Sequence, residues 1–228
     1  MRALTQISIV CLVLALVMLT TARVAKAIPL AVPQTVETIP DKTPYKLVCK
    51  RDRCDLFLGP VIGSDDNYVK LFEQLPLLPA KTVLVVHLAG RGGLVSSMDR
   101  LISALRTTKA QVIGLVEGEV ASAHATLAIS IPKLYSNPHT LFMFHKPALQ
   151  NGVTIKQVCS EYKGQKDRGI DVELKCLDDM EAHIEAGTAH ILELLDGKLT
   201  KEEIQKFKQG HDIYKTAKEL GIPPLQPI

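Results

Sequence analysis

Ser122 lies at a position in the sequence where a nucleophile could act. An apolar run ends near Val116, Gly118 follows, and an Ala-rich segment typical of a helix begins just after Ser122. A serine at the start of a helix lies beside free backbone N–H groups, which can stabilise the oxyanion formed by its attack on a carbonyl. The alternative interpretation is an ordinary N-cap serine.

Two further segments suit the same acyl-transfer chemistry. His145 directly follows the apolar run 141–144, and α/β proteins place their sites at the C-terminal ends of strands. Gly92 and Gly93 follow another apolar run, where glycine lets backbone amides approach a ligand. Taken singly, a tight turn and an exposed or core histidine remain the alternatives. Taken together, the three segments indicate a nucleophile, a base and a backbone anion site.

The apolar pattern predicts the elements that position these residues. Continuous apolar runs are typical of strands covered on both faces, and they alternate here with segments of helical periodicity. The expected strands are 45–49, 55–58, 82–88, 111–116 and 141–144, and the expected helices are 65–75, 94–106, 121–131, 178–195 and 200–208. Asp65 and Asp66 are expected to cap the first helix, and Thr200 with Glu203 predicts a capping box. The alternation predicts an α/β fold with a largely parallel core sheet.

The N-terminal segment predicts export. Residues 1–27 have a positive start at Arg2, an uncharged stretch over 4–22, and small residues at Ala25 and Ala27, which is the layout of a secretory signal peptide. An uncleaved membrane anchor is the alternative, because a span needs about 20 apolar residues. The four prolines within residues 28–44 then predict an extended linker.

Cleavage after Ala27 changes the charge and cysteine counts. It removes three of the 27 Lys and Arg residues and none of the 24 acidic residues, so 24 of each sign remain. It also removes Cys11. The cysteines that remain are Cys49, Cys54, Cys159 and Cys176. An even number in an exported chain favours disulfides, and the spacing favours Cys49–Cys54 with Cys159–Cys176 over the two other pairings. A zinc site made by all four lacks the usual Cys-x2-Cys spacing.

Composition excludes several classes of protein. An apolar content of 46% is too high for a disordered chain. A net charge of +3, with no Trp and 4% aromatics, does not favour nucleic-acid binding. We expect no nucleic-acid partner, no cofactor and no metal.

Five segments in the same order resemble the proteolytic subunit of the Clp protease and the related signal peptide peptidases of the crotonase-like superfamily. Residues 57–62 resemble the opening strand of that family, and residues 83–93 its strand and Ser-Pro-Gly-Gly turn, here Gly-Arg-Gly-Gly. Residues 116–123 resemble the nucleophile motif Gly-x-Ala-Ala-Ser, residues 141–147 the strand ending in a histidine before a proline, and residues 212–222 the acidic residue and closing segment. The resemblance implies repeated β-β-α units with a largely parallel core and flanking helices over residues 45–228. A polar, cysteine-containing insertion is expected at about 147–178.

The resemblance also implies a mechanism. Ser122 would be the nucleophile, His145 the general base and Asp212 the acid that orients the imidazole. The backbone N–H groups of Gly93 and Ala123 would form the oxyanion hole.

This chain departs from the family pattern at three places. His124 stands where the family has glycine, so it is expected either to crowd the site or to supply an alternative base. Arg91 replaces the usual proline. Asp212 matches only if about three residues are missing after Thr216, which leaves Asp178 and Asp179 as alternative acids.

These observations predict an exported serine endopeptidase acting on peptides or unfolded proteins. It is expected to be periplasmic or secreted and homo-oligomeric, with a membrane tether if the N-terminal segment stays uncleaved. No ATP-driven unfoldase is expected outside the cytoplasm. The alternatives are a catalytically inactive binding or scaffold protein on the same fold and, disfavoured by export, a crotonase-type acyl-CoA enzyme.

Overall fold

The computed structural model describes residues 44–148, 159 and 172–225. All of them belong to one compact unit, Glu37–Gln226; a second unit, Met1–Val36 with Pro227–Ile228, lies outside the described residues. The expected signal peptide, nearly all of the expected linker and most of the insertion at 147–178 lie outside them too. Among the helices within the described ranges, none has the length and apolar character needed to cross a bilayer.

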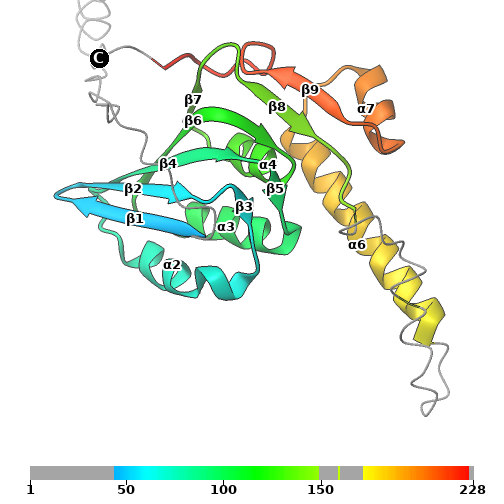
Figure 1. The fold of residues 1–228 in the computed structure, drawn as a ribbon, viewed down its shortest axis with the longest axis horizontal. Coiled ribbons are helices and arrows are strands. Elements are labelled where there is room, and N and C mark those ends of the chain that lie inside the picture. Colours follow the sequence, from blue (N-terminus) through cyan, green and yellow to red (C-terminus); the bar gives the residue numbers. More distant parts are fainter. Residues whose placement is uncertain (1–43, 149–158, 160–171, 226–228) are drawn as a thin grey trace, which may run out of the picture. The chain divides into compact units, whose positions relative to one another are not determined.

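Strands and helices alternate along the described chain (Figure 1). The strands are β1 (Tyr45–Lys50), β2 (Arg53–Leu58), β3 (Val61–Ile62), β4 (Val83–Gly90), β5 (Gly92–Gly93), β6 (Gln111–Ala121), β7 (Leu134–Ser136), β8 (Leu141–Phe144) and β9 (Ile213–Thr216). The α-helices are α2 (Val69–Gln74), α3 (Val95–Thr107), α4 (Ala123–Ile129), α6 (Val172–Leu194) and α7 (Lys201–Lys208), with 3-10 turns η1 (Asp65–Tyr68) and η2 (Leu75–Leu77) on either side of α2.

The main sheet has the strand order β1-β2-β4-β6-β8-β9, and β7 also pairs with β6. The central pairings β2–β4, β4–β6 and β6–β8 are parallel, whereas the edge strands β1 and β9 are antiparallel to their neighbours. A second, small sheet pairs β3 with β5. The predicted α/β class with a largely parallel core is therefore confirmed.

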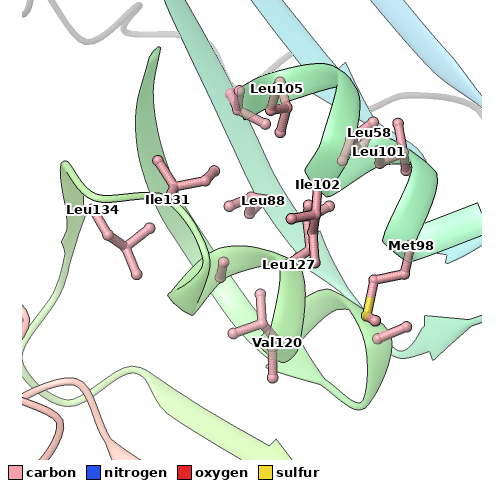
Figure 2. Packing of buried hydrophobic residues seen from close by; sticks show 14 of the residues in the cluster. Leu58, Leu88, Met98, Leu101, Ile102, Leu105, Val120, Leu127, Ile131 and Leu134 are labelled. Carbon is pink, nitrogen blue, oxygen red and sulfur yellow. The ribbon is translucent and has the colours of Figure 1, made fainter. Parts of the chain in front are cut away.

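The main core lies between one face of the sheet and the helices. Alternate residues of β4, Leu84, Val86 and Leu88, belong to it, because successive side chains of a strand point to opposite faces. Figure 2 shows Met98, Leu101, Ile102 and Leu105 of α3 packed near Leu88 and Leu127. The apolar stripe of α3 thus fixes the helix that directly follows the glycine-rich loop.

Some elements differ from the sequence expectation. The helix expected over 65–75 is split into η1, α2 and η2. The N-cap position of η1 is Ser64 and no side chain makes a capping hydrogen bond there, so the capping predicted for Asp65 and Asp66 is wrong. Asp65 instead pairs with Arg100 of α3, with 2.6 Å between Oδ2 and Nη1. The capping box of Thr200 and Glu203 is confirmed.

The boundaries of several other elements also differ. Helix α6 begins at Val172 rather than at residue 178, and β6 runs to Ala121 rather than Val116. The short strands β3, β5, β7 and β9 were not predicted, because two to four residues are too few to establish an alternating pattern.

The geometry of the four cysteines is compatible with the two favoured disulfides. Cys49 and Cys54 are paired residues of the β1–β2 hairpin, with 2.07 Å between their sulfurs. The sulfurs of Cys159 and Cys176 lie 2.02 Å apart.

Removing the hairpin disulfide is expected to lower the free energy of unfolding by roughly 2 kcal/mol. The closed loop is short, with a sequence separation of 5, and the entropy taken from the unfolded chain grows with loop length. Urea unfolding of a Cys49→Ala/Cys54→Ala variant against the wild type, both without reductant, measures the difference. Equal unfolding free energies would contradict a bond between these two cysteines.

Candidate active site

Ser122 stands at the junction of β6 and α4 in the middle of the sheet. Its backbone N–H donates to the carbonyl of Met143 at 2.8 Å, which continues the pairing of β6 with β8. Although Ser122 occupies the N-cap position of α4, its side chain makes no capping hydrogen bond. The hydroxyl is half-buried and has no hydrogen-bond partner among the described residues. The interpretation as a capping serine is therefore not supported.

The backbone at Ser122 is held in an uncommon conformation. Its φ of 55° and ψ of −126° lie outside the regions that non-glycine residues favour. The register of β6 against β4 shifts just before it: Leu88 pairs with Val116 and Gly90 with Val120, so four steps along β6 match two along β4. Such conformations cost about 1–3 kcal/mol and persist only where surrounding contacts enforce them. The β6–β8 hydrogen bond and α4 provide that enforcement.

The glycine-rich loop packs directly against Ser122. A Cβ on Gly92 would lie 2.5 Å from the Ser122 Cβ and 2.8 Å from its Oγ. Gly92 also has φ +113°, which L-residues rarely adopt. The loop is fixed from the other side, because Arg91 N–H donates to the Pro60 carbonyl and Leu94 N–H to the Ile62 carbonyl, both at 2.9 Å.

For the peptidase chemistry predicted from the sequence, Gly92→Ala is expected to lower the rate of hydrolysis about 10²- to 10³-fold, which is the size of effect seen when an oxyanion-hole donor is lost. The added methyl group would displace either Ser122 or the loop. Gly118→Ala is the matched control, because a Cβ there would meet only the Ala89 Cβ at an ordinary 3.5 Å. Peptide-hydrolysis kinetics of both variants measure the effect, and wild-type kinetics in Gly92→Ala would contradict close packing at Ser122.

His145 follows β8, the neighbour of β6, and Asp212 precedes β9, the strand beyond β8. His145 directly follows β8, and β9 pairs antiparallel with β8 so that Phe144 faces Ile213 (Figure 1). His145 and Asp212 thus each lie one residue beyond that last pair, and Ser122 directly follows β6, the other neighbour of β8.

The side chains of these residues are not joined by hydrogen bonds in the described part of the chain. His145 Nδ1–H donates to the Lys146 carbonyl at 2.7 Å, and Asp212 is exposed. In this tautomer the lone pair of the ring is on Nε2, the nitrogen that a general base needs. The alternative acids Asp178 and Asp179 are exposed on α6.

The predicted oxyanion donors belong to the helix that follows Ser122 and to the glycine-rich loop that packs against it. Ala123 is the first residue of α4, at whose start Thr126 N–H donates to the Ser122 carbonyl at 3.0 Å. N–H groups in the first turn of a helix have no acceptor within the helix. Gly93 follows Gly92 in β5, with φ +144°.

The scan against family models matched the Clp protease model over residues 45–189, well over half of the chain. The chain belongs to the Clp protease family. The match includes Ser122 and His145 and ends before Asp212. A search of curated proteins found no match.

His124 stands at the position where the family pattern has glycine, two residues after Ser122. The ring is fully buried, and both of its nitrogens bond backbone groups: Nδ1 accepts from Gly92 N–H at 3.2 Å and Nε2 donates to the Gly59 carbonyl at 3.0 Å. Neither nitrogen remains for the Ser122 proton, so the expectation of an alternative base is not supported. The predicted crowding is relieved because Gly90 has no side chain; a Cβ there would lie 2.7 Å from the His124 ring.

A buried charged network on the other face of the sheet was not predicted. His87 of β4 is 3% exposed and lies between two carboxylates on the neighbouring strands. Its Nε2 is 3.0 Å from Asp55 Oδ1 and its Nδ1 is 3.1 Å from Glu117 Oε2, while Arg53 holds Asp55 from the other side. The ring also stacks on Phe57 at 4.1 Å. Within the described residues, no cluster of His, Cys, Asp and Glu could hold a metal ion.

The carboxylates stabilise the charged form of His87. Burial alone would lower the His87 pKa, but hydrogen bonds to Glu117 and Asp55 outweigh it and raise that pKa above 6.5. Burial would likewise raise the pKa of Asp55, but hydrogen bonds from Arg53 and His87 bring it below 3.8. Between pH 3.8 and pH 6.5, which are the ordinary pKa values of Asp and His, both groups therefore contribute fully to the stability of the folded protein. The Asp55 contribution is lost as pH falls through its lowered pKa, and the His87 contribution as pH rises through its raised pKa.

His87→Gln is expected to lower the free energy of unfolding at pH 6 by about 2 kcal/mol, since it removes hydrogen bonds between charged groups. The loss should shrink as pH rises, because the wild-type ring then loses its proton. Urea unfolding from pH 5 to 9 measures this, with the exposed His139→Gln as control. A difference that stays constant with pH would show that the ring is not charged in the folded protein.

Proposed function

We propose that this Clp family member is an exported serine endopeptidase that uses Ser122, His145 and Asp212. The observation that carries the proposal is the Ser122 hydroxyl: it stands on a strained turn, is not used as a helix cap, and lies against Gly92. The family match over residues 45–189 supports peptidase chemistry.

In the proposed reaction Ser122 Oγ attacks the carbonyl carbon of the scissile peptide bond, and its proton passes to His145 Nε2. The developing oxyanion accepts hydrogen bonds from Gly93 and Ala123 N–H. The imidazolium then gives its proton to the leaving amine, which breaks the C–N bond and leaves an acyl-serine. Water, deprotonated by His145, hydrolyses the acyl-serine and restores the hydroxyl. Asp212 would orient the imidazole, with the Lys146 carbonyl holding Nδ1–H in the free protein.

The proposed substrates are peptides or unfolded segments, and we propose a homo-oligomer, as is typical of this family. We also propose that the protein acts outside the cytoplasm, in the periplasm or secreted. The N-terminal sequence and the cysteine geometry support this compartment. N-terminal sequencing of the exported protein tests the cleavage: a start at Ile28 supports a signal peptide, and a retained Met1 supports the anchor.

A second candidate is a catalytically inactive binding protein on the same fold. It is favoured by one observation: the His145 ring bonds the Lys146 carbonyl, and no hydrogen bond links it to Ser122 or Asp212 within the described ranges. Catalytic hydrogen bonds are often long or misaligned before substrate binds, so this geometry does not exclude the first candidate.

Labelling with a fluorophosphonate probe separates the two candidates. A competent site is expected to carry the label on Ser122, identified by mass spectrometry of the digested protein. Ser130→Ala is the control, because Ser130 is another half-buried serine at an end of α4, and it donates to Leu127 instead. Folded protein that takes up no label at Ser122 would favour the inactive candidate.

A further inference from the structure

The His124 ring connects three segments that are distant in sequence. It projects from the first turn of α4, two residues after Ser122, and bonds Gly59 after β2 and Gly92 in the glycine-rich loop. The sequence separations of these bonds are 65 and 32 residues. The ring therefore ties the helix that follows Ser122 to the glycine-rich loop and to the segment after β2, which itself bonds that loop through Pro60 and Arg91.

The surroundings of the ring are shaped to accept it. Gly90 leaves room for the ring, because a Cβ on Gly90 would lie 2.8 Å from His124 Nε2 and 2.7 Å from the Pro60 carbonyl oxygen. Gly92 leaves room for Ser122 in the same way. A smaller residue at position 124 would leave an empty space and an unpaired N–H at Gly92, which is costly when buried. The two nitrogens thus satisfy one buried donor and one buried acceptor.

The contacts also determine the protonation state of the ring. Nδ1 can accept from Gly92 N–H only while it carries no proton, and Nε2–H then donates to the Gly59 carbonyl. Burial lowers the His124 pKa, and the groups that act on the ring are the backbone of Gly92 and Gly59, with no charged side chain among them. The ring is therefore neutral at physiological pH.

We propose that His124 is a positioning residue for the active site: by bonding Gly92 and Gly59 it holds the glycine-rich loop in the conformation that packs against Ser122. The role rests on the proposed peptidase function. The His124 ring is fully buried, so it acts through the loop that it bonds. Its contribution is to keep Gly92, and with it Gly93, from moving away from the nucleophile while negative charge develops.

The test compares three variants by peptide-hydrolysis kinetics. His124→Asn places an amide oxygen near the position of Nδ1 and retains the acceptor for Gly92; His124→Leu has a similar volume and no polar group. Ser130→Ala, at the C-terminal end of the same helix, is the control. A displaced oxyanion donor is expected to lower kcat of His124→Leu about 10- to 100-fold, with KM changed less than about twofold. His124→Asn should recover most of the loss.

Two results would overturn the proposal. The first is a folded His124→Leu variant with wild-type kcat. If that variant does not fold, His124→Gln replaces it, because its longer side chain keeps a donor for Gly59 and offers no acceptor at the position of Nδ1. The second overturning result is then an equal kcat in His124→Gln and His124→Asn.

Amide hydrogen exchange at Gly92 separates this proposal from the peptidase proposal. Exchange is expected to be slow in the wild type and in His124→Asn, and at least tenfold faster in His124→Leu or His124→Gln. A wild-type protein without activity but with this exchange pattern would refute the peptidase and retain the role of His124 in holding the loop. Equally slow exchange in all variants would refute that role itself.

Discussion

Ser122→Ala is expected to lower kcat for peptide hydrolysis by about 10⁶-fold, the loss found when the nucleophile of a serine-protease triad is removed. Alanine keeps the backbone and removes only the hydroxyl, which has no hydrogen-bond partner in the described part of the protein. The free energy of unfolding should therefore change by less than about 0.5 kcal/mol. Steady-state kinetics with a fluorogenic peptide, together with thermal unfolding, measure both quantities.

The control for this experiment is Ser130→Ala, which should retain activity. Hydrolysis that persists in Ser122→Ala at more than about a hundredth of the wild-type rate would place the nucleophile elsewhere. A contaminating peptidase is distinguished by its failure to follow the protein through the final purification step.

Asp212→Asn is expected to lower kcat by about 10⁴-fold, because an amide cannot stabilise the imidazolium and favours the wrong tautomer. Asp212 precedes β9 and His145 follows β8, each one residue beyond the last pair of the register, Phe144 with Ile213. Asp212 is exposed, so the substitution should leave the unfolding free energy nearly unchanged. Activity measured as a function of pH gives the change in kcat.

A loss of less than tenfold in Asp212→Asn would assign the orienting role to the Lys146 carbonyl, which already bonds His145 Nδ1. The parallel variant Asp178→Asn tests the alternative acid on α6. If Asp178→Asn lost activity and Asp212→Asn did not, the acid would have to be reassigned.

The sequence predicts the central sheet well for a physical reason. The runs in β4, β6 and β8 are apolar and continuous, as expected of strands covered on both faces, and the structure confirms that they are strands of a largely parallel core. The short strand β9 is different: Ile213 is buried and Tyr214 exposed, and four residues with one alternation do not distinguish a strand from a turn. Its pairing with β8 depends on tertiary contacts.

The candidate site could be predicted only in part. Residue type and order point to Ser122 and His145, but the backbone strain at Ser122 and the register shift in β6 arise from pairing between strands. The two bonds of His124 reach residues 65 and 32 positions away, so no local pattern reveals them. A signal for His87 did exist: it is a lone histidine within an apolar run, with Asp55 at the start of the preceding run and Glu117 directly after the following one.

The position of β9 has a consequence for the order in which the protein matures. Chains are synthesised from the N-terminus, so Ser122 after β6 and His145 after β8 are present before β9, the strand of the sheet that comes last in chain order. A chain that still lacks β9 has β8 as an unpaired edge of the sheet. The proposed triad would therefore be complete only after this last strand has joined the sheet.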